Sequence, residues 1–145
     1  MEALKKSKLQ SIQMIGRRGA TQASFSTKEI KDLCSLSNMP EFYIVKSEWD
    51  DSLATDASKT ELLVRGVGRR TEFLGQKATM IESHEQYLDI MNNSHRKLIL
   101  RFLRKPVALV PNEKDKSKIG SVEVKKQKLV GEAEKQEAVD ADTPD

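Results

Sequence analysis

The sequence has little of what metal centres, disulfide frameworks and base-stacking surfaces require. Its 145 residues include one cysteine and two histidines, and only 5% of them are aromatic. The single Cys34 excludes an internal disulfide, while His84 and His95 lack a paired cysteine or a cage of carboxylates. We therefore expect no metal site and no platform for unpaired bases. Cys34 is expected to be a small core residue, and Trp49 a half-buried anchor.

Long apolar runs and a charge excess of one sign are absent as well. No apolar stretch approaches the ~20 residues that a membrane-spanning helix needs. The 25 lysines and arginines nearly balance the 22 acidic residues, which leaves a net charge of +3. A dedicated nucleic-acid binder carries a more one-sided charge, so we expect neither a transmembrane segment nor a nucleic-acid partner. The apolar content of 37% is lean, which argues against a large independent core.

The glycine-rich turn of dinucleotide-binding folds is also missing. Such folds hold a pyrophosphate at a helix N-terminus through a Gly-x-Gly-x-x-Gly or Gly-x-Gly-x-x-Ala turn. Neither pattern occurs in the sequence. The run Gly66-Val67-Gly68-Arg69-Arg70-Thr71 begins like one, but no strand of sufficient length precedes it. We expect Arg69 and Arg70 to diverge on a helix as solvated charges.

The sequence does contain a strand, an arginine-bearing turn and a helix in direct succession. Residues Ile12–Ile15 form a short apolar run without helical spacing, so we predict a buried strand. The turn Gly16-Arg17-Arg18-Gly19 ends that strand. After it, Ser26-Thr27-Lys28-Glu29 is a capping-box pattern, which predicts the start of a helix.

The two arginines of the turn suit recognition of a phosphate group. In dinucleotide-binding sheets, arginine near the end of the second strand pairs with the 2′-phosphate of NADP, whereas a carboxylate there selects NAD. A guanidinium presents two parallel donors to phosphate oxygens and stays charged at every relevant pH. Paired arginines in a turn are also common as solvated surface charge. Taken alone, Arg17 and Arg18 leave both interpretations open.

The segment around this turn resembles one in the adrenodoxin reductase family, the FAD-containing NADPH–ferredoxin reductases. The family's run reads much like Gly-Arg-Arg-Gly-Pro-x-Gln-x-Ala-Phe-Thr-x-Lys-Glu. Residues 16–29 keep its arginines, glycines, glutamine, phenylalanine, lysine and glutamate at unchanged spacing. Ala20 replaces the family's proline, which costs some turn rigidity. A looser likeness follows at Leu100–Pro106, which is similar to the family's Leu-Arg-Phe-Phe-Arg-x-Pro strand.

The resemblance implies a role for three residues. In the family, the positions that match Arg17 and Arg18 bind the 2′-phosphate of NADPH, and the position that matches Glu29 also lines that site. Glu29 stands three residues after Ser26 and can also cap the helix, and the two roles are compatible. The implied cofactors are NADP and, in the intact family enzyme, FAD, whose site is not expected in this chain.

The resemblance also implies a fold class. It is α/β, a fragment of a Rossmann-like, ββα three-layer NADP-binding domain with an inserted β-hairpin and helices. Residues 1–131 are expected to be a partial NADP-binding domain without its first strand and glycine-rich loop, and Met1–Lys8 the end of a helix. Residues 132–145 are rich in acids and poor in apolar side chains, which predicts an acidic, disordered C-terminal tail.

Local patterns predict the remaining elements. Leu98–Val110 has the apolar content of one strand and Ile119–Val130 alternates, so together they predict a β-hairpin that needs a third partner. Glu41–Val45 is strand-like in content, although the resemblance implies irregular structure there. The capping-box pattern Ser58-Lys59-Thr60-Glu61 predicts a helix over residues 58–74. A further helix is predicted over residues 83–91, with Tyr87, Ile90 and Met91 on one face.

Two functions are consistent with these features. By resemblance, the chain is part of an NADPH–adrenodoxin/ferredoxin reductase-like flavoenzyme that passes electrons from NADPH via FAD to an iron–sulfur ferredoxin, and it is expected to be inactive in isolation. The alternative is a non-catalytic module or remnant that binds NADP or another 2′-phosphoadenosine ligand. The family implies a mitochondrial location, in the matrix or at the inner-membrane face, and leaves room for peripheral membrane association of the intact enzyme. No targeting sequence is expected within the chain itself.

Overall fold

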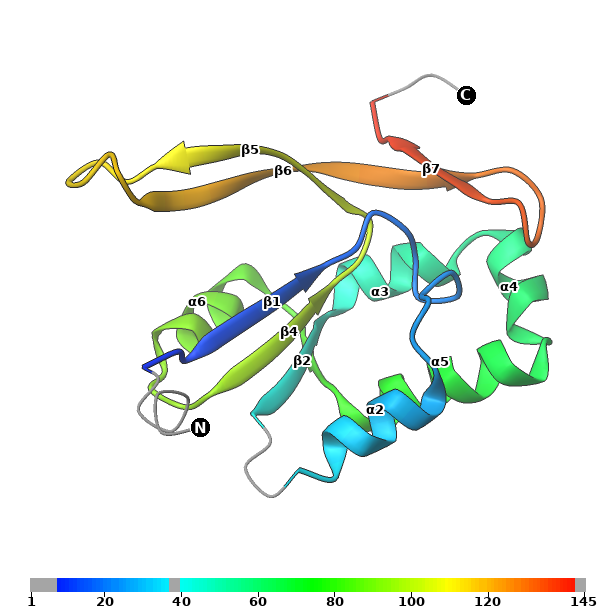
Figure 1. Cartoon of the computed structure of the whole chain (residues 1–145). Helices are drawn as coiled ribbons and strands as arrows, with labels where there is room; N and C mark the ends of the chain where they lie inside the picture. The colour runs from blue at the N-terminus through cyan, green and yellow to red at the C-terminus, as the bar shows by residue number, and fades with distance from the viewer. Residues whose placement is uncertain (1–7, 37–39, 143–145) are drawn as a thin grey trace.

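The chain forms a parallel sheet flanked by helices and a smaller antiparallel sheet (Figure 1). The computed structural model describes residues 8–36 and 40–142. The predicted helix end at Met1–Lys8 lies outside the described residues, apart from Lys8 itself. Both the expected α/β class and the expected hairpin are confirmed.

The parallel sheet has four strands in the order β1-β4-β2-β3. They are β1 (Ser11–Ile15), β2 (Glu41–Val45), β3 (Thr79–Ile81) and β4 (Lys97–Arg101). Because all of them run parallel, their carboxyl ends meet at one edge, which is where open α/β sheets bind ligands. The arginine-bearing turn follows β1 and therefore lies at this edge.

Helices cover both faces of the parallel sheet. They are α2 (Thr27–Cys34), α3 (Lys46–Leu53), α4 (Asp56–Leu62), α5 (Arg65–Lys77) and α6 (His84–Asn92). On one face, Ile30 of α2 and Leu74 of α5 join the buried core cluster with Phe42 and Leu98 of the sheet. On the other face, α6 contacts β1, where Gln13 Nε2 donates to the Tyr87 hydroxyl at 3.0 Å. The core thus lies mainly between the sheet and the α2–α5 pair.

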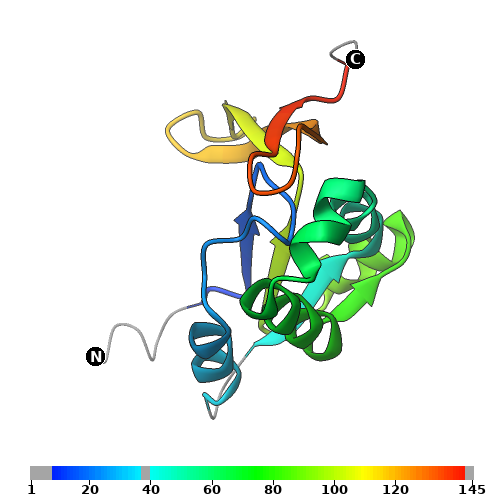
Figure 2. The same cartoon turned by 90° about the vertical axis from the view of Figure 1, so that its right-hand side faces the viewer.

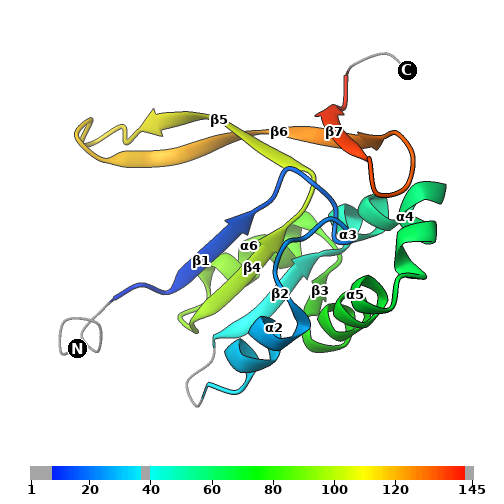
Figure 3. The same cartoon turned by 45° about the vertical axis from the view of Figure 1, so that its right-hand side comes forward.

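The antiparallel sheet lies across the carboxyl ends of β1 and β4 (Figures 1 and 2). Its strands are β5 (Arg104–Pro111), β6 (Ile119–Val130) and β7 (Glu137–Asp140), in that order. The β5–β6 hairpin extends past β1 (Figure 3). Leu129 of β6 is 8% exposed and joins the main core, so the second sheet is packed onto the first.

The predicted disordered tail over residues 132–145 was wrong for most of its length. Strand β7 pairs with β6, with Gln127 opposite Asp140 and Val130 opposite Glu137, and so supplies the third partner that the hairpin needs. Gln136 is 6% exposed and donates to Ser58 Oγ at 3.1 Å. The acidic composition did not predict β7, because this strand is held by backbone pairing and buried amides rather than by apolar side chains.

The predicted single strand over Leu98–Val110 is two strands in different sheets. Phe102 and Leu103 separate β4 from β5 and are both buried, at 5% and 2% exposed. Leu103 adopts a left-handed conformation with φ of 54°, which is costly for a leucine but turns the chain from one sheet into the other. The continuous apolar pattern gave no sign of this turn.

Three further expectations needed correction. Glu41–Val45 is the strand β2, with Ile44 fully buried, and not the irregular segment that the resemblance implied. The helix predicted over residues 58–74 is divided into α4, which Thr55 caps, and α5. Strand β1 exists but lies at the sheet edge rather than buried inside, with Ile12 45% and Met14 47% exposed.

Other expectations were met. Helix α6 covers the predicted span and begins after the cap Ser83. Trp49 is partly buried and packs against Phe102, with ring centroids 6.0 Å apart. Cys34 is partly buried against the core. Within residues 8–36 and 40–142, no helix combines the length and apolar character needed to cross a bilayer.

Candidate functional site

The turn Gly16–Gly19 is held by the backbone that connects β4 to β5. Gly16 N–H donates to the Arg101 carbonyl at 2.9 Å, and its own carbonyl accepts from Arg104 N–H at 3.0 Å. The Arg18 carbonyl accepts from Leu103 N–H at 3.2 Å. The left-handed turn at Leu103 therefore serves the site, because it brings these donors against the arginine-bearing turn.

Gly19 packs closely against elements distant in sequence. A Cβ atom at this position would lie 3.0 Å from Ser52 Cβ of α3 and 3.0 Å from Leu129 Cδ1 of β6. Gly19 is thus needed for contact within the protein, rather than for contact between a ligand and the backbone.

Gly19→Ala is therefore expected to lower the free energy of unfolding by about 1–3 kcal/mol through overpacking. Chemical denaturation of the variant measures this. Gly66→Ala is the control, because a Cβ at Gly66 meets nothing within 4 Å. Equal stability of the two variants would contradict the packing described for Gly19.

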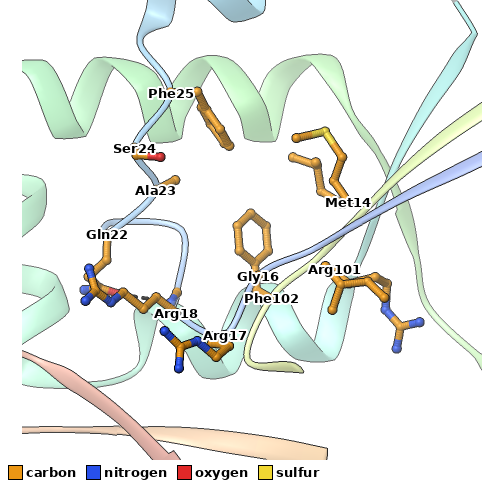
Figure 4. Close-up of a pocket in the computed structure, with 13 residues that line it drawn as sticks. Met14, Gly16, Arg17, Arg18, Gln22, Ala23, Ser24, Phe25, Arg101 and Phe102 are labelled. Atoms are coloured by element: carbon orange, nitrogen blue, oxygen red, sulfur yellow. Dashed lines mark hydrogen bonds between the residues drawn. The ribbon is translucent and has the colours of Figure 1, made fainter. Parts of the chain in front are cut away.

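Arg17 and Arg18 line a groove of about 350 Å³ at the carboxyl end of β1. Both side chains are exposed, and among the described residues neither guanidinium has an ion-pair or hydrogen-bond partner. Figure 4 shows the two side chains at one end of the groove, with Phe25, Met14 and Phe102 toward the other. The groove thus combines two available cations with a surface of apolar and aromatic side chains.

The apolar part of the groove continues into a second pocket. This second pocket has a volume of about 300 Å³ and shares Met14, Phe25 and Leu100 with the groove. Glu29 lies on the lining of this second pocket and not of the groove itself. The predicted site residues are therefore neighbours, but only the arginines face the groove.

Glu29 fulfils the capping role predicted for it. Its carboxylate accepts from Ser26 N–H at 2.6 Å and from Ser26 Oγ at 2.9 Å, while Ser26 Oγ accepts from Glu29 N–H at 3.2 Å. These bonds, the backbone one first, lower the pKa of Glu29. The role of Glu29 toward a cofactor stays a prediction.

Gln22 fixes the far end of the turn. Its Oε1 accepts from Gly19 N–H at 3.0 Å, and its Nε2 donates to Glu61 Oε2 at 2.5 Å. Glu61 is 6% exposed and also accepts from Glu134 N–H at 2.9 Å and Gln136 Nε2 at 3.1 Å. Burial opposes ionisation of Glu61, but hydrogen bonds, first from Thr21 and then from Glu134, outweigh it and lower the pKa.

Arg70 supports the same loop from α5. Its guanidinium donates to the Thr21 carbonyl at 2.8 Å and to the Phe25 carbonyl at 3.4 Å. The prediction of a solvated charge was therefore wrong for Arg70, whereas Arg69 is exposed as expected. Burial lowers the pKa of Arg70. The charge is used to hold the backbone of the loop.

Arg101 lines the groove, but its guanidinium is already engaged. Glu48, which is 2% exposed, accepts from Arg101 Nη2 at 2.6 Å, from Arg104 Nε at 2.9 Å and from Phe102 N–H at 3.0 Å. Burial disfavours the charged guanidinium of Arg101, but Glu48 outweighs it and raises the pKa. Arg17 and Arg18 are thus the groove's uncommitted cations.

The histidines do not form part of the groove. His95 Nδ1 lies 3.2 Å from Glu41 Oε1 at the other end of the sheet, and His84 stacks on Tyr87. In the part of the chain that the structure describes, no group of three or more metal-ligating side chains gathers.

Comparison with known proteins finds relatives of one kind. No family model matches the chain. It is 35% identical over 109 residues to a probable mitochondrial NADPH:adrenodoxin oxidoreductase of Dictyostelium discoideum, covering 75% of the chain and 19% of that relative. It is 29% identical over 140 residues to the enzyme of that name from Salvelinus fontinalis, covering 96% of the chain and 26% of the relative.

The chain matches part of the NADPH:adrenodoxin oxidoreductase family. It spans about a fifth to a quarter of the length of these curated relatives. Solved structures agree on the fold: FprA of Mycobacterium tuberculosis in complex with NADPH superposes with a TM-score of 0.64 at 21% identity, over 92% of this chain and 26% of that one. The α/β fold is therefore that of part of FprA.

The described residues do not fit the flavin of an adrenodoxin oxidoreductase. A dinucleotide's pyrophosphate needs a glycine-rich turn from strand to helix. Here the turn after β1 carries two arginines, and Ser52 and Leu129 already occupy the space beside Gly19. The two guanidinium groups of this turn are exposed and unpaired within the described residues.

The roles that three further residues have in the site could not be predicted from the sequence. Gln22 belongs to the run that resembles the adrenodoxin reductase family, but its contacts depend on the fold. Glu61 was expected to close a capping box with Ser58, which was wrong, because Thr55 caps α4 and Glu61 is buried beneath the turn. Glu48 stands beside the exposed Asp50 and Asp51, and nothing local marks it as buried. The partners of Glu48 are 53 or more residues away in sequence, and those of Glu61 are 39 or more.

Proposed function

We propose that this chain binds the 2′-phosphoadenosine end of NADPH in the groove at the carboxyl end of β1. The observation that carries the proposal is the pair of exposed arginines, Arg17 and Arg18, without ion-pair or hydrogen-bond partners among the described residues. A phosphate carries up to two charges and three acceptor oxygens, which two adjacent guanidinium groups match.

The composition of the groove supports NADP over NAD. No aspartate or glutamate is among the residues that line it. NAD is recognised by a carboxylate that accepts from the ribose 2′-hydroxyl, and this groove offers none. The aromatic ring of Phe25, together with Met14, provides apolar surface for a flat base beside the phosphate.

The relatives suggest the larger reaction. We infer that the chain contributes this nucleotide site to an NADPH–adrenodoxin/ferredoxin reductase-like flavoenzyme, in which FAD carries electrons to an iron–sulfur ferredoxin. The relatives' names include adrenodoxin and the mitochondrion, which supports a ferredoxin-type partner and a mitochondrial location for this chain. Peripheral association of the intact enzyme with the inner membrane fits this location.

The 145 residues alone are not expected to reduce a ferredoxin, because they contain no glycine-rich fingerprint for FAD. This absence favours, as the second candidate, a non-catalytic module that binds 2′-phosphoadenosine groups. The coding sequence upstream discriminates the two. In-frame glycine-rich fingerprints there support the flavoenzyme, and their absence supports the module.

Calorimetric titration of the chain with 2′,5′-ADP and with 5′-AMP tests the shared proposal. We expect 2′,5′-ADP to bind at least tenfold more tightly, because the second phosphate adds charge-assisted hydrogen bonds. Equal affinity for the two ligands would overturn the proposal.

Phe25→Ala is expected to weaken 2′,5′-ADP and 5′-AMP alike, by about five- to a hundredfold, because both share the base that contacts the ring. The same titrations measure this. Phe73→Ala is the control, since Phe73 is a partly buried ring of α5 outside the groove. An effect confined to 2′,5′-ADP would contradict placement of the base at Phe25.

A further inference from the structure

Hydrogen bonds hold the Arg17–Arg18 turn at both ends, but the two ends differ in kind. At the first end, Gly16 is fixed by backbone bonds to Arg101 and Arg104. At the second, Gly19 N–H depends on a side chain, the amide oxygen of Gln22, at 3.0 Å. Arg18 stands directly before Gly19, and Figure 4 shows its side chain beside Gln22. The orientation of one amide therefore bears on where Arg18 is presented.

Glu61 determines that orientation. An ionised carboxylate only accepts hydrogen bonds, so it must face the –NH₂ end of Gln22, and the amide oxygen is left to face Gly19 N–H. Gln22 Nε2 also lies 2.5 Å from Thr21 Oγ1. An uncharged amide at position 61 could meet either end of Gln22, and the reversed amide would place a donor against Gly19 N–H.

Glu61 is itself fixed from the opposite side by the segment after β6. Glu134 N–H and Gln136 Nε2 both donate to Glu61 Oε1, whereas Gln22 donates to Oε2. Glu134 adopts a left-handed conformation, with φ of 65°, as it presents its N–H. No basic side chain pairs with this carboxylate among the described residues. A buried anion without a counter-ion is held in place only by such donors.

We propose that Glu61 is a positioning residue for 2′-phosphate recognition: through Gln22 it holds Gly19, and hence the Arg17–Arg18 turn, in its binding conformation. This rests on the proposed function of the groove. Pre-organisation of the turn lowers the ordering cost that a ligand contacting the arginines would otherwise meet. A ligand that lacks the 2′-phosphate does not contact the arginines, so pre-organisation of the turn does not increase its affinity. The structure thus assigns to a remote buried carboxylate a role in choosing NADP over NAD.

Glu61→Gln tests the proposal by titration with 2′,5′-ADP and 5′-AMP. We expect 2′,5′-ADP to bind about five- to tenfold more weakly, with less than about a twofold change for 5′-AMP, since one neutral hydrogen bond is lost at the turn. Ser83→Ala is the control for general destabilisation. It removes the side-chain cap of helix α6, and Ser83 makes no hydrogen bond to Glu61, Gln22 or Gln136. It should lower the melting temperature and leave the ratio of the two affinities unchanged.

A double-mutant cycle separates positioning from general loosening. In a background with both Arg17 and Arg18 replaced by alanine, Glu61→Gln should have no further effect on 2′,5′-ADP, because the groups that it positions are gone. Gln22→Met, which keeps the side-chain length and removes the hydrogen bonds to Gly19, Thr21 and Glu61, should reproduce Glu61→Gln. Suppose that the wild type prefers 2′,5′-ADP over 5′-AMP. If both Glu61→Gln and Gln22→Met then keep the full preference, this inference alone is overturned. It is also overturned if Ser83→Ala weakens the preference for 2′,5′-ADP as much as Glu61→Gln does. A wild type without any preference overturns the proposed function and this inference together.

Discussion

Replacing Arg17 and Arg18 together by alanine is expected to remove the preference for 2′,5′-ADP over 5′-AMP. Each charge-assisted hydrogen bond contributes about 1.5–3 kcal/mol, so each single alanine variant should weaken 2′,5′-ADP about ten- to a hundredfold. Neither arginine has a hydrogen-bond or ion-pair partner among the described residues, so their removal breaks no such contact within the fold. The melting temperature should therefore stay close to that of the wild type.

Three comparisons make this result specific to the turn. Arg69→Ala removes an exposed arginine of α5 outside the groove and should leave both affinities unchanged. Arg18→Lys keeps the charge without the planar pair of donors and should recover only part of the binding. The preference should also weaken as salt is added, because exposed charges are screened. Full retention of 2′,5′-ADP binding by the double alanine variant would contradict the assignment.

Glu48→Ala is expected to have the largest effect on stability of any substitution considered. Glu48 is 2% exposed and accepts from Arg101, from Arg104 and from Phe102 N–H. Removing one partner of a buried ion cluster leaves the others charged and unpaired, which typically costs about 3–5 kcal/mol. Such a loss is a large fraction of the stability of a small domain.

Denaturation with urea measures this loss. Asp50→Ala is the control, since it breaks the exposed pair with Lys46 on the same helix, where solvent screens the charges, and should change the midpoint little. If Glu48→Ala unfolds completely, Glu48→Gln retains the shape and should still be clearly less stable than wild type. A midpoint for Glu48→Gln equal to that of Asp50→Ala would contradict a stabilising role for the cluster.

Glu48 also engages the third arginine that lines the groove. The Nε and Nη2 atoms of Arg101 are bonded to Glu48 at 3.0 and 2.6 Å. The Arg101 guanidinium also lies over the Tyr87 ring of α6 and points away from Arg17 and Arg18 (Figure 4). The cluster thus joins β4, α3 and β5, and Arg17 and Arg18 are left as the arginines that face the groove.

The parts of the fold that could be predicted from the sequence are those written in local patterns. The capping box at Ser26 and Glu29, the strand before Gly16 and the alternation over Ile119–Val130 each depend on neighbours within a few residues. The turn with Arg17 and Arg18 is a local pattern as well, so the sequence predicts the candidate site but not the residues that surround it.

The parts that could not be predicted depend on distant contacts. The left-handed Leu103 interrupts a continuous apolar run only because its neighbours bond to the turn at Gly16–Arg18. Strand β7 forms in an acidic segment because β6 offers it a free edge. Glu48 and Glu61 have no local mark that separates them from solvated acids such as Asp50. Tertiary context decides each of these, and one chain's sequence does not display it.

Amide correlation spectra of the isotopically labelled chain, recorded during titration with 2′,5′-ADP, test the central claim most directly. Specific binding at the turn predicts saturable shifts for the amides of Arg17–Phe25 and for Phe102, with much smaller shifts when 5′-AMP is added. Shifts that cluster elsewhere, or that are the same for both ligands, would contradict the claim that this turn recognises the 2′-phosphate.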